Sequence, residues 1–541
     1  MRALPPSTRP FADTALIAVL KQLNSNLETN QNSASSITSV KALLGFANLY
    51  SSKDVKPANE ANKRYQNVIS AANPSESVLA NLSRVRFEYT SRQDTPNVVQ
   101  SLSRATKNKV IKFVKDHQAS NAVRLLESIS KGETPIDNFK DKPEVMEALK
   151  QLHPNKDPNR DNLPLPGADH QAFLITKVEL MVYLKKLPPN KAAALSGWTF
   201  ELIKTFIDKS DALADEIVRL FNLMVNGKGG PASVWLASRL IPIKKGAGGI
   251  RPIAVADCWM RFLAGFLAQK FAPDAARSFA PHQFGVGVSG GMEIVVHAAK
   301  TAVKYTASDS AQGDPHVVLA IDCRNAFNCL GRRAIYNKMT SVFPSLSKFI
   351  FWAYGSATPI YASDGTFLFF SETGVKQGDP LGPLLFAAGL QDVLTRLHSR
   401  LPGVTILAYL DDITLIGPPA LVAAAFEWLV RELALLGLDI NPNKCQLFYN
   451  QTYTPVLPEE FSRIQPSTTY IKILGTPMGA DGEIVEDIKL TMADYSKLLP
   501  YILQLPASTA YILLKSCSSQ TDSSPSHRRS SAHLRAYQRL R

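Results

Sequence analysis

Three aspartates stand directly beside short apolar runs, where their carboxylates could bind a divalent cation. Asp411 and Asp412 interrupt the apolar stretch Val404–Gly417 (VTILAYLDDITLIG), and Asp322 follows the run Val317–Ile321. Ionised carboxylates beside buried strands are costly unless a positive charge compensates them. Hard oxygen ligands on neighbouring strand ends suit Mg²⁺, and two such ions about 4 Å apart clamp an in-line phosphoryl transfer. We therefore expect these aspartates to form one metal site; the alternative for the adjacent pair alone is a polar turn between core strands.

A cluster of basic residues lies at a second predicted hairpin. The segments SRLIPIKK and GIRPIAV within Trp235–Val255 have strand patterns, and a glycine-rich turn joins them. Lys244 and Lys245 precede this turn and Arg251 follows it. Lysine offers a point charge and arginine a planar pair of donors, so the cluster suits a triphosphate. The alternative is a turn whose charges only aid solubility.

Two further polar residues stand in motifs that indicate rigid backbone. Gln377 lies in Gly374–Phe386 (GVKQGDPLGPLLF), where glycines and prolines predict a stiff loop before a helix. It could contact a nucleotide base or template, or only hydrogen-bond within the loop. Asp379 is well placed to cap the helix. Lys444 follows a short strand pattern in GLDINPNK and is either functional or an ordinary surface lysine.

The pattern from residue 316 onward predicts how these residues are positioned. We expect, in order, a strand (316–321), helices (331–354 and 380–399), a hairpin (404–416), a helix (419–436) and a strand (438–449). This order approximates the split βαβ arrangement, which would put Asp322 and Asp411 on adjacent central strands. Residues 355–373 receive no assignment.

The chain is long and basic. Its 541 residues are enough for two to four domains, and 45% hydrophobic with 20% charged residues is typical of a globular protein. The net charge of +14 and pI of about 9.4 favour a polyanionic partner such as nucleic acid, with a merely basic surface as the alternative. The five cysteines show no zinc or disulfide spacing. Without a signal peptide or bilayer-length apolar run, the chain is expected to be intracellular and not membrane-bound.

Both ends are less informative. Residues 1–170 alternate polar stretches with helical patterns, and Pro154–Pro166 (PNKDPNRDNLPLP) has the composition of a linker. Residues 516–541 are rich in serine and arginine and lack a helical apolar stripe, which predicts disorder.

The order of these motifs resembles that of the reverse transcriptases. The motifs are RLIPIKK with RPIAV, AIDCRNAF, VKQGDPLGPLLF, AYLDDI, GLDINPNK and YIKILG. The QGDP form most resembles the non-LTR (LINE-type) retrotransposon group, and the likeness runs from about residue 175 to 478. A lone aspartate pair is a weak signal, whereas six motifs in the family's order are a strong one.

The resemblance implies an α+β right-hand polymerase fold with fingers, a ferredoxin-like palm and a partial helical thumb, after a mostly helical N-terminal extension. The implied divisions are 1–170 for the extension and linker, 171–300 for the fingers, 301–478 for the palm with its primer-grip strand, 479–515 for the thumb and 516–541 for the tail.

The resemblance also implies an RNA-directed DNA polymerase with assigned residues. Asp322 and Asp411, supported by Asp412, would hold two Mg²⁺ ions, for which Mn²⁺ could substitute. The incoming dNTP would meet side chains from several motifs, namely Lys244 or Lys245, Arg251, Gln377 and the steric gate Phe327. Lys444 would protonate the leaving pyrophosphate, and Leu474–Gly475 would belong to the primer grip. The implied partners are an RNA template and a DNA primer, with endonuclease activity supplied elsewhere.

Some positions depart from the family pattern, and rival functions remain. Asn328 replaces a usual aspartate, Leu410 a smaller residue and Gly382 a common serine, while KAAALSGW has Ala194 and Ser196 where Gly and Asp are frequent. None removes a predicted metal ligand. A truncated, catalytically silent nucleic-acid-binding remnant is the main alternative. An RNA-dependent RNA polymerase is a third, against which the Phe327 gate argues.

Overall fold

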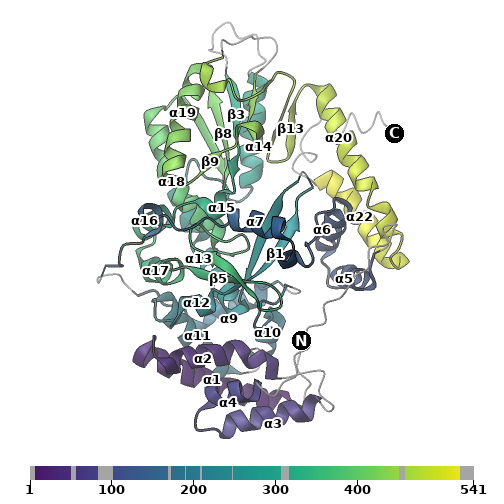
Figure 1. Ribbon diagram of the computed structural model, residues 1–541. Coiled ribbons are helices and arrows are strands. Elements are labelled where there is room, and N and C mark those ends of the chain that lie inside the picture. Colours follow the sequence, from purple (N-terminus) through teal and green to yellow (C-terminus); the bar gives the residue numbers. More distant parts are fainter. Residues whose placement is uncertain are drawn as a thin grey trace.

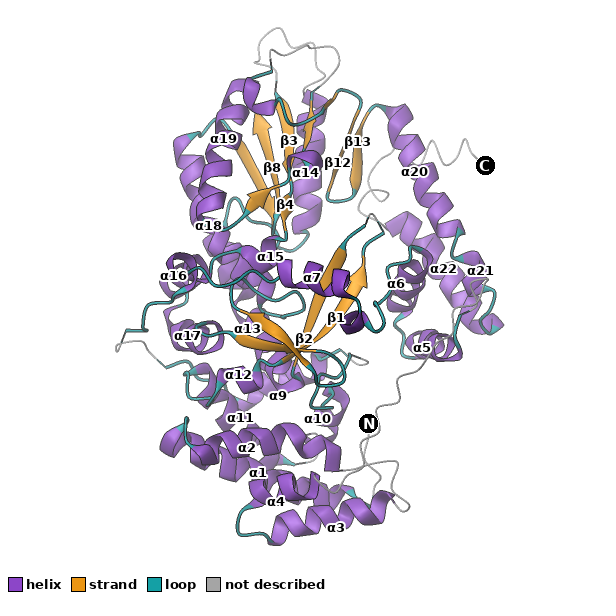
Figure 2. Ribbon diagram, in the orientation of Figure 1, coloured by secondary structure: helices purple, strands orange, loops and turns teal. Residues whose placement is uncertain are grey.

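The computed structural model describes residues 7–49, 57–82, 102–167, 172–188, 191–207, 210–246, 248–305, 316–449 and 457–523. Helices and two principal sheets form a mixed α+β structure (Figures 1 and 2). N-terminal helices lie at the bottom of the view in Figure 1, the five-stranded sheet lies at the top, and the C-terminal helices stand at the right.

The N-terminal region is helical, as predicted, and joins the main core. Its helices are α1 (Arg9–Asn30), α2 (Ala34–Gly45), α3 (Pro57–Ser70), α4 (Pro74–Leu82), α5 (Arg104–Lys115), α6 (Ala119–Ser130), α7 (Pro143–Gln151) and α8 (Pro158–Asp161). In α1 an apolar stripe including Leu16, Leu20 and Leu23 is fully buried, because this spacing puts the side chains on one face. These leucines share one hydrophobic cluster with residues as distant as Ile464.

A helical layer leads from this region to the first sheet. It contains α9 (Lys177–Lys186), α10 (Phe200–Ile207), α11 (Asp211–Val225), α12 (Ala232–Trp235) and α13 (Cys258–Phe279). The sheet has the order β2-β1-β5-β6, with β1 (Ser238–Lys244), β2 (Ile250–Ala256), β5 (Thr358–Tyr361) and β6 (Phe367–Ser371). β1 and β2 form the predicted hairpin. The unassigned segment 355–373 supplies β5 and β6, which pair across a register shift.

The second sheet has the order β11-β10-β3-β8-β7. Its strands are β3 (Val317–Ile321), β7 (Thr405–Tyr409), β8 (Asp412–Gly417), β10 (Gln446–Phe448) and β11 (Pro466–Ser467). Helices cover both faces, so alternate residues of one strand enter different clusters: Leu319 packs into the main core, and Val318 packs with the cluster that includes α14 (Gly291–Tyr305). Burial on both faces explains why these strands are uninterrupted apolar runs.

The helices predicted around this sheet are present with shifted bounds. They are α16 (Arg332–Val342), α17 (Ser347–Tyr354), α18 (Gly382–Arg400) and α19 (Pro419–Leu435). A further short helix, α15 (Ala326–Cys329), was not predicted. One predicted helix over 331–354 is two, because Pro344 begins a short 3-10 turn between them. The predicted strand over 438–449 is also two short pieces, β9 (Asp439–Ile440) and β10, with Pro442 beginning the turn that separates them. The predicted cap is wrong: α18 begins at Gly382, and Asp379 Oδ1 instead accepts from Leu381 N at 3.0 Å in the preceding turn.

The C-terminal part forms a hairpin and three helices. β12 (Tyr470–Ile473) pairs with β13 (Thr476–Gly479), followed by α20 (Asp481–Ser496), α21 (Leu499–Ile502) and α22 (Ala507–Ser523). Buried residues of α21 and α22 form a separate cluster with α5 and α6, from the other end of the chain (Figure 1). Helix α22 reaches into the segment predicted to be a tail, whose remaining residues 524–541 lie outside the described ranges.

The segment predicted to be a linker packs closely against its neighbours. Asp161, at the end of α8, is only 2% exposed and accepts hydrogen bonds from Arg332 N and Thr373 Oγ1. These bonds fix the segment to α16 and to the loop after β6.

Candidate active site

A tight hairpin presents two of the three aspartates. Tyr409 of β7 pairs with Asp412 of β8, so only Leu410 and Asp411 form the turn. Leu410 has φ of 59°, which is uncommon for a residue with a side chain. The side chain of Gln283 holds this conformation, because its Oε1 accepts from Leu410 N at 2.8 Å.

Strand register brings the third aspartate beside this turn. Ile321 of β3 pairs with Ile413 of β8, so Asp322 and Asp412 are the next residues on adjacent strands. Burial, and then the Asp322 charge, raise the pKa of Asp411 above its ordinary value. Burial, followed by the charges of Asp411 and Asp322, raises the pKa of Asp412 to about 6 although its side chain reaches solvent. The predicted juxtaposition of the aspartates is therefore present.

These carboxylates lie at the neighbouring ends of β3 and β8 and do not form a complete set of metal ligands by themselves. Within the described ranges, no three His, Cys, Asp or Glu side chains are arranged as a group able to hold a metal ion. Magnesium at phosphoryl-transfer sites usually takes one or two carboxylates and completes its shell with water and substrate phosphates. The donor set of hard oxygens, whose mutual repulsion a cation would relieve, fits a divalent ion bound together with a nucleotide.

Basic side chains surround the carboxylates. The side chain of Lys245 is exposed, yet partial desolvation lowers its pKa, as do the charges of Lys444 and Arg251, while Asp322 acts in the opposite direction. Asn441 N donates to Asp322 O at 2.8 Å, which fixes the turn carrying Lys444 beside the strand carrying Asp322. The structure thus relates three of the predicted basic residues to the acidic group.

Lys244 is placed differently from its neighbour. It is exposed at the end of β1, and its amide donates to Thr134 O at 3.1 Å. Of the two lysines offered as alternatives by the sequence, Lys245 is the one coupled to Asp322.

A small cavity of about 120 Å³ joins several predicted residues. Asp322, Asp412 and Lys444 line it, together with Leu474 from the β12–β13 turn. Leu474 and Gly475 have φ of 47° and 77°, the left-handed backbone typical of two-residue hairpins. The predicted primer-grip residues therefore lie at the edge of the acidic site.

Phe327, in α15, and Gln377, in the loop before α18, lie on two segments that contact each other. The Phe327 ring stacks on Phe386 with centroids 4.6 Å apart, and Phe327 O accepts from Val375 N at 2.8 Å. Gln377 O accepts from Ala254 N of β2 at 2.8 Å, which leaves the half-buried Gln377 side chain available for other contacts. Gly378 is required here, because its φ is 111° and a Cβ would lie 2.8 Å from a backbone oxygen of β2.

Two buried polar residues that the sequence analysis missed hold these loops. Lys376 is 5% exposed, and its Nζ donates to Leu236 O, Ser238 Oγ and Thr358 Oγ1 at 2.8–3.3 Å. Gln283, 1% exposed, accepts from both Leu410 N and Gly285 N.

Both residues lie next to glycine-rich motifs, and that position is the signal that could have identified them. The glycine motif after Gln283 packs closely on backbone, because a Cβ on Gly287 would overlap Ala272 O.

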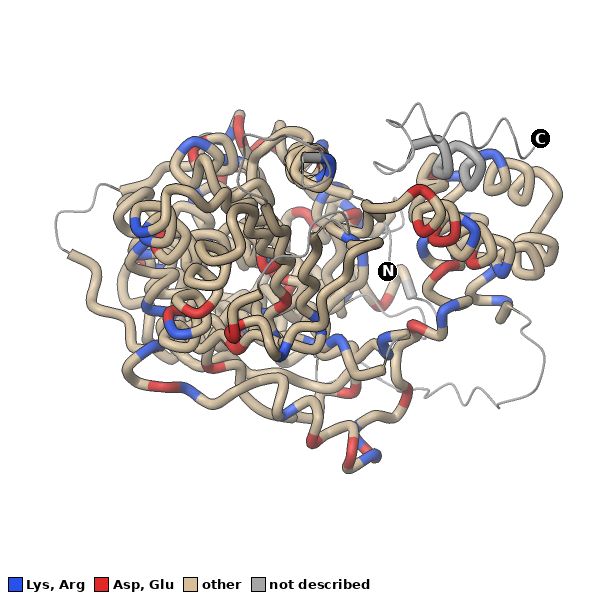
Figure 3. Tube along the Cα trace, turned by 90° about the horizontal axis from the view of Figure 1, so that it is seen from above, with Lys and Arg blue, Asp and Glu red and all other residues tan. Residues whose placement is uncertain are grey.

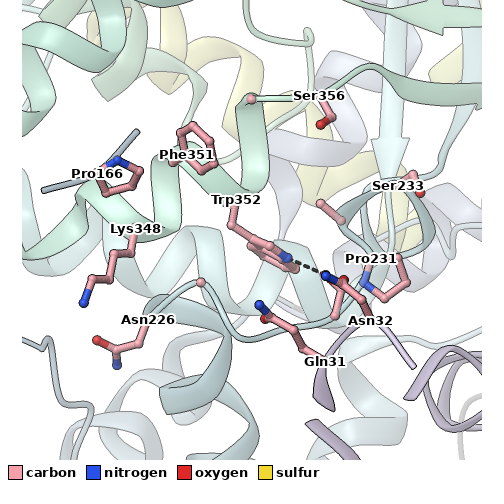
Figure 4. Close-up of a pocket in the computed structure, with 14 residues that line it drawn as sticks. Gln31, Asn32, Pro166, Asn226, Pro231, Ser233, Lys348, Phe351, Trp352 and Ser356 are labelled. Carbon is pink, nitrogen blue, oxygen red and sulfur yellow. Dashed lines mark hydrogen bonds between the residues drawn. The ribbon is translucent and has the colours of Figure 1, made fainter. Parts of the chain in front are cut away.

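One large cavity lies away from this site. A cavity of about 500 Å³ lies where the turn after α1 meets α17, and Gln31, Asn226 and Trp352 line it (Figure 4). Trp352 Nε1 donates to Gly230 O at 2.6 Å there. None of the predicted site residues lines this cavity. Lysine and arginine are spread over several faces of the molecule rather than gathered on one (Figure 3).

Comparisons with known proteins identify the class of the central region. Residues 243–478 match the family described as reverse transcriptase (RNA-dependent DNA polymerase). That range begins near the end of β1 and ends in β13, so it includes the whole five-stranded sheet and every aspartate and lysine predicted for the site. The central region of the chain is therefore similar to the reverse transcriptase family.

Proteins similar to this chain come from retrotransposable elements. The chain is 27% identical over 275 residues to the retrotransposable element SLACS 132 kDa protein of Trypanosoma brucei gambiense, covering 49% of this chain and 22% of that protein. It is 30% identical over 186 residues to a Pol polyprotein of the type-1 retrotransposable element R2 of Popillia japonica, covering 30% of this chain and 29% of that one. A second R2 polyprotein matches at 27% over 277 residues, 46% of this chain and 37% of the relative.

These matches confirm the predicted resemblance to non-LTR retrotransposon reverse transcriptases. The chain spans between about a fifth and two fifths of the length of these relatives. A domain of this family implies a divalent metal together with an RNA template, a primer and dNTPs. Among the helices described, none has both the length and the apolar character that a membrane crossing requires.

Proposed function

We propose that this chain is an RNA-directed DNA polymerase of a non-LTR retrotransposon, acting inside the cell. It would transfer a nucleotide from a dNTP to the 3′-OH of a DNA primer paired with an RNA template. The observation that carries the proposal is the β3–β8 register, which puts Asp322 beside the Asp411–Asp412 turn, with Lys245 and Lys444 around them.

Each side chain has a part in the proposed reaction. Asp322 and Asp411 bind the metal ions and Asp412 adds negative charge beside them. Two Mg²⁺ ions, when bound, activate the attacking hydroxyl and stabilise the departing pyrophosphate. Lys245 and Arg251 bind the triphosphate, because both are fixed on the β1–β2 hairpin next to Asp322. Lys444 is exposed within the cavity that Asp322 lines, where it can donate a proton to the leaving group.

The remaining assignments concern substrate position and the larger divisions of the chain. Phe327 excludes the ribose 2′-OH, Gln377 contacts the nucleotide or template, and Leu474 with Gly475 supports the primer end. In this proposal residues 171–300 act as fingers, 301–478 as palm and 479–515 as a partial thumb, after the helical extension 1–170. The hairpin carrying Lys245 and the C-terminal helices beyond β13 support these divisions.

Primer extension tests the proposal directly. Purified protein would be given poly(rA)/oligo(dT), dTTP and Mg²⁺, with Mn²⁺ in a parallel series. We expect the wild type to extend the primer and Asp411→Ala to abolish extension. Asp211→Ala is the matched control, because its side chain is 95% exposed and far along the chain from the site. Folded wild-type protein that failed to extend the primer across a range of salt concentrations would overturn the proposal.

A further inference from the structure

A second cavity, of about 520 Å³, lies between α7 and β6 and has no role in the chemistry described above. Phe367, Phe369, Phe370 and His153 line it, together with Glu147 and Glu372. Its volume is within the range usual for ligand sites. Its walls come from the segment before the predicted fingers and from the strand that the sequence analysis left unassigned, so neither was linked to function beforehand.

Two phenylalanine rings form an open platform at this cavity. Phe367 and Phe370 are each 47% exposed, and their ring centroids are 5.0 Å apart. Residues three apart normally face opposite sides of a strand, but the register shift between Ile360 and Tyr361 turns both rings to the same side. Exposed paired rings on a sheet are suited to stacking against another flat ring.

His153 supplies a buried acceptor that has no partner. Its side chain is 8% exposed and packs against Phe369 with ring centroids 4.8 Å apart. Nδ1 lies 2.8 Å from Leu149 O, a carbonyl that can only accept, so Nδ1 carries the hydrogen and Nε2 carries a lone pair. Nε2 is buried without a hydrogen-bond partner. A buried polar atom of this kind calls for a donor from a ligand.

The surrounding groups favour a ligand that is flat and rich in donors. The carboxylates of Glu147 and Glu372 also accept hydrogen bonds, and Glu372 already takes one from Lys156 N at 3.0 Å. Lys150 lies on the same wall and can meet a phosphate. The amino-bearing nucleobases combine a stacking face with N–H donors, and the strand that carries them supplies the phosphates.

The cavity is also joined to the active site by short connections. Asn325 Nδ2 and Asn328 Nδ2 both donate to Leu152 O, at 2.8 and 3.0 Å, which fixes the end of α7 to the loop carrying Phe327. On the opposite wall, β6 leads within six residues to Gln377. A nucleic-acid strand that passes Gln377 therefore has the platform beside its path.

We propose that this cavity binds one unpaired nucleobase of a single-stranded RNA, whose exocyclic amino group donates to His153 Nε2. Because the planes of Phe367 and Phe370 are tilted by 57°, the base stacks on the face of one ring and meets the other at its edge. The proposal deepens the proposed function, on which it rests for the presence of an RNA strand. Cytosine, adenine and guanine carry the required amino group and uracil does not.

Binding of short RNAs by the full-length Asp411→Ala protein tests the subsite without requiring catalysis. Fluorescence anisotropy with labelled r(C)12 and r(U)12 is expected to show tighter binding of r(C)12. Phe367→Ala/Phe370→Ala should weaken r(C)12 binding about tenfold, whereas Phe367→Tyr/Phe370→Tyr should retain it. His153→Phe should remove the preference for r(C)12. Leu174→Ala is the control for an exposed apolar residue elsewhere, being 69% exposed, and should change nothing.

Photo-crosslinking locates the base. An r(C)12 strand with one 5-iodocytidine should crosslink to the peptide containing residues 367–370, and the double alanine variant should lose this product. Unchanged r(C)12 affinity in the double alanine variant, with crosslinks elsewhere, would overturn the subsite. So would an arginine-rich peptide whose binding alone depends on these rings, because it would assign the cavity to a cationic protein segment. A wild type that shows the crosslink but no primer extension would keep the subsite and reject the proposed function.

Discussion

At the scale of single residues, folding brings the negatively charged carboxylates of Asp322, Asp411 and Asp412 close together. Asp411 and Asp412 are raised in pKa mainly by burial and then by carboxylate neighbours. A group whose pKa is higher in the folded than in the unfolded protein destabilises the fold as pH rises through these values. At neutral pH the ionised carboxylates of the metal-free site therefore destabilise the folded protein, and a bound cation would reduce their repulsion.

Replacing one carboxylate should stabilise the metal-free protein. In EDTA at pH 7, Asp412→Asn is expected to raise the free energy of unfolding by on the order of 1 kcal/mol, a small value because solvent screens the exposed side chain. The advantage should vanish below about pH 4, where Asp412 is protonated in both states. Thermal unfolding across pH measures this. Mg²⁺ should raise the melting temperature of the wild type more than that of the variant, and an equal rise in both would contradict a role for the Asp412 charge beside the metal.

Phe327 makes a separate prediction about sugar selection. Phe327→Ala should increase the use of rNTPs relative to dNTPs, because the space that the ring fills would admit a 2′-hydroxyl. Competitive incorporation of dTTP and UTP on poly(rA)/oligo(dT) measures the ratio. Phe386→Leu, which alters the ring that Phe327 stacks on, tests whether the orientation of the gate matters. Equal use of both nucleotides by the wild type would reject the gate and favour an RNA polymerase.

The sequence predicts the acidic residues and the surface lysines of this site but not the buried residues Gln283 and Lys376 that hold its loops. Asp322, Asp411 and Lys444 stand at the ends of recognisable apolar runs, so their convergence could be predicted from strand order. For Gln283 and Lys376 the sequence offers only their position beside glycine-rich motifs, because their partners Leu410 and Leu236 lie more than a hundred residues away. A hydrogen bond across such a separation leaves no periodic pattern in the chain.

At the scale of elements, the β7–β8 hairpin depends on a residue outside it. A two-residue turn with a leucine at positive φ is unfavourable by itself, and Gln283 compensates by satisfying the Leu410 amide. The hairpin is thus held by its neighbour as much as by its own sequence.

Gln283→Met should test this dependence. The substitution keeps the size of the side chain but leaves two buried amides without an acceptor, which should lower kcat for primer extension roughly tenfold or more through misplacement of Asp411. The KM for the template–primer should change little. Gln391→Met is the control, since that buried glutamine lies within α18 and not at the hairpin. A normal kcat in a folded Gln283→Met protein would show that the turn is positioned without it.

Helices and strands could be predicted from the sequence where a single physical rule determines their pattern. The doubly buried strands and the β1–β2 hairpin were predicted because apolar runs and glycine turns are strong local signals. The β5–β6 pair was missed, because its exposed phenylalanines and bulge break the alternation that identifies a strand. The N-cap at Asp379 was wrong because the turn continues through Leu381 before the helix begins.

At the scale of the whole molecule, helices α5 and α6 share one small core with the C-terminal helices α21 and α22, which are far from them in the sequence. Val110 and Leu126 of α5 and α6 are buried with Tyr501 and Leu513 of α21 and α22. Leu102 N also donates to Gln504 Oε1 at 2.8 Å. No local pattern could predict this, because each helix only shows that it has an apolar face and not which partner covers it.

Loosening this core should affect both ends together. Leu513→Ala is expected to destabilise it by about 2–5 kcal/mol, since the side chain is fully buried. Hydrogen exchange should then rise in α5 and α6 as well as in α21 and α22, while β3 and β8 stay protected. Leu503→Ala, at a position 76% exposed, should leave exchange unchanged. Faster exchange confined to the C-terminal helices would show that the two ends are not coupled.

This shared core sets an order of events during synthesis. Helices α5 and α6 leave the ribosome more than 350 residues before α21 is made, an interval on the order of tens of seconds at usual elongation rates. During that time the apolar faces of α5 and α6 have no native partner. They stay exposed until α21 and α22 are made and pack against them. A chaperone that binds exposed apolar segments would be expected to bind this protein early in synthesis and to dissociate only after the C-terminal helices have folded.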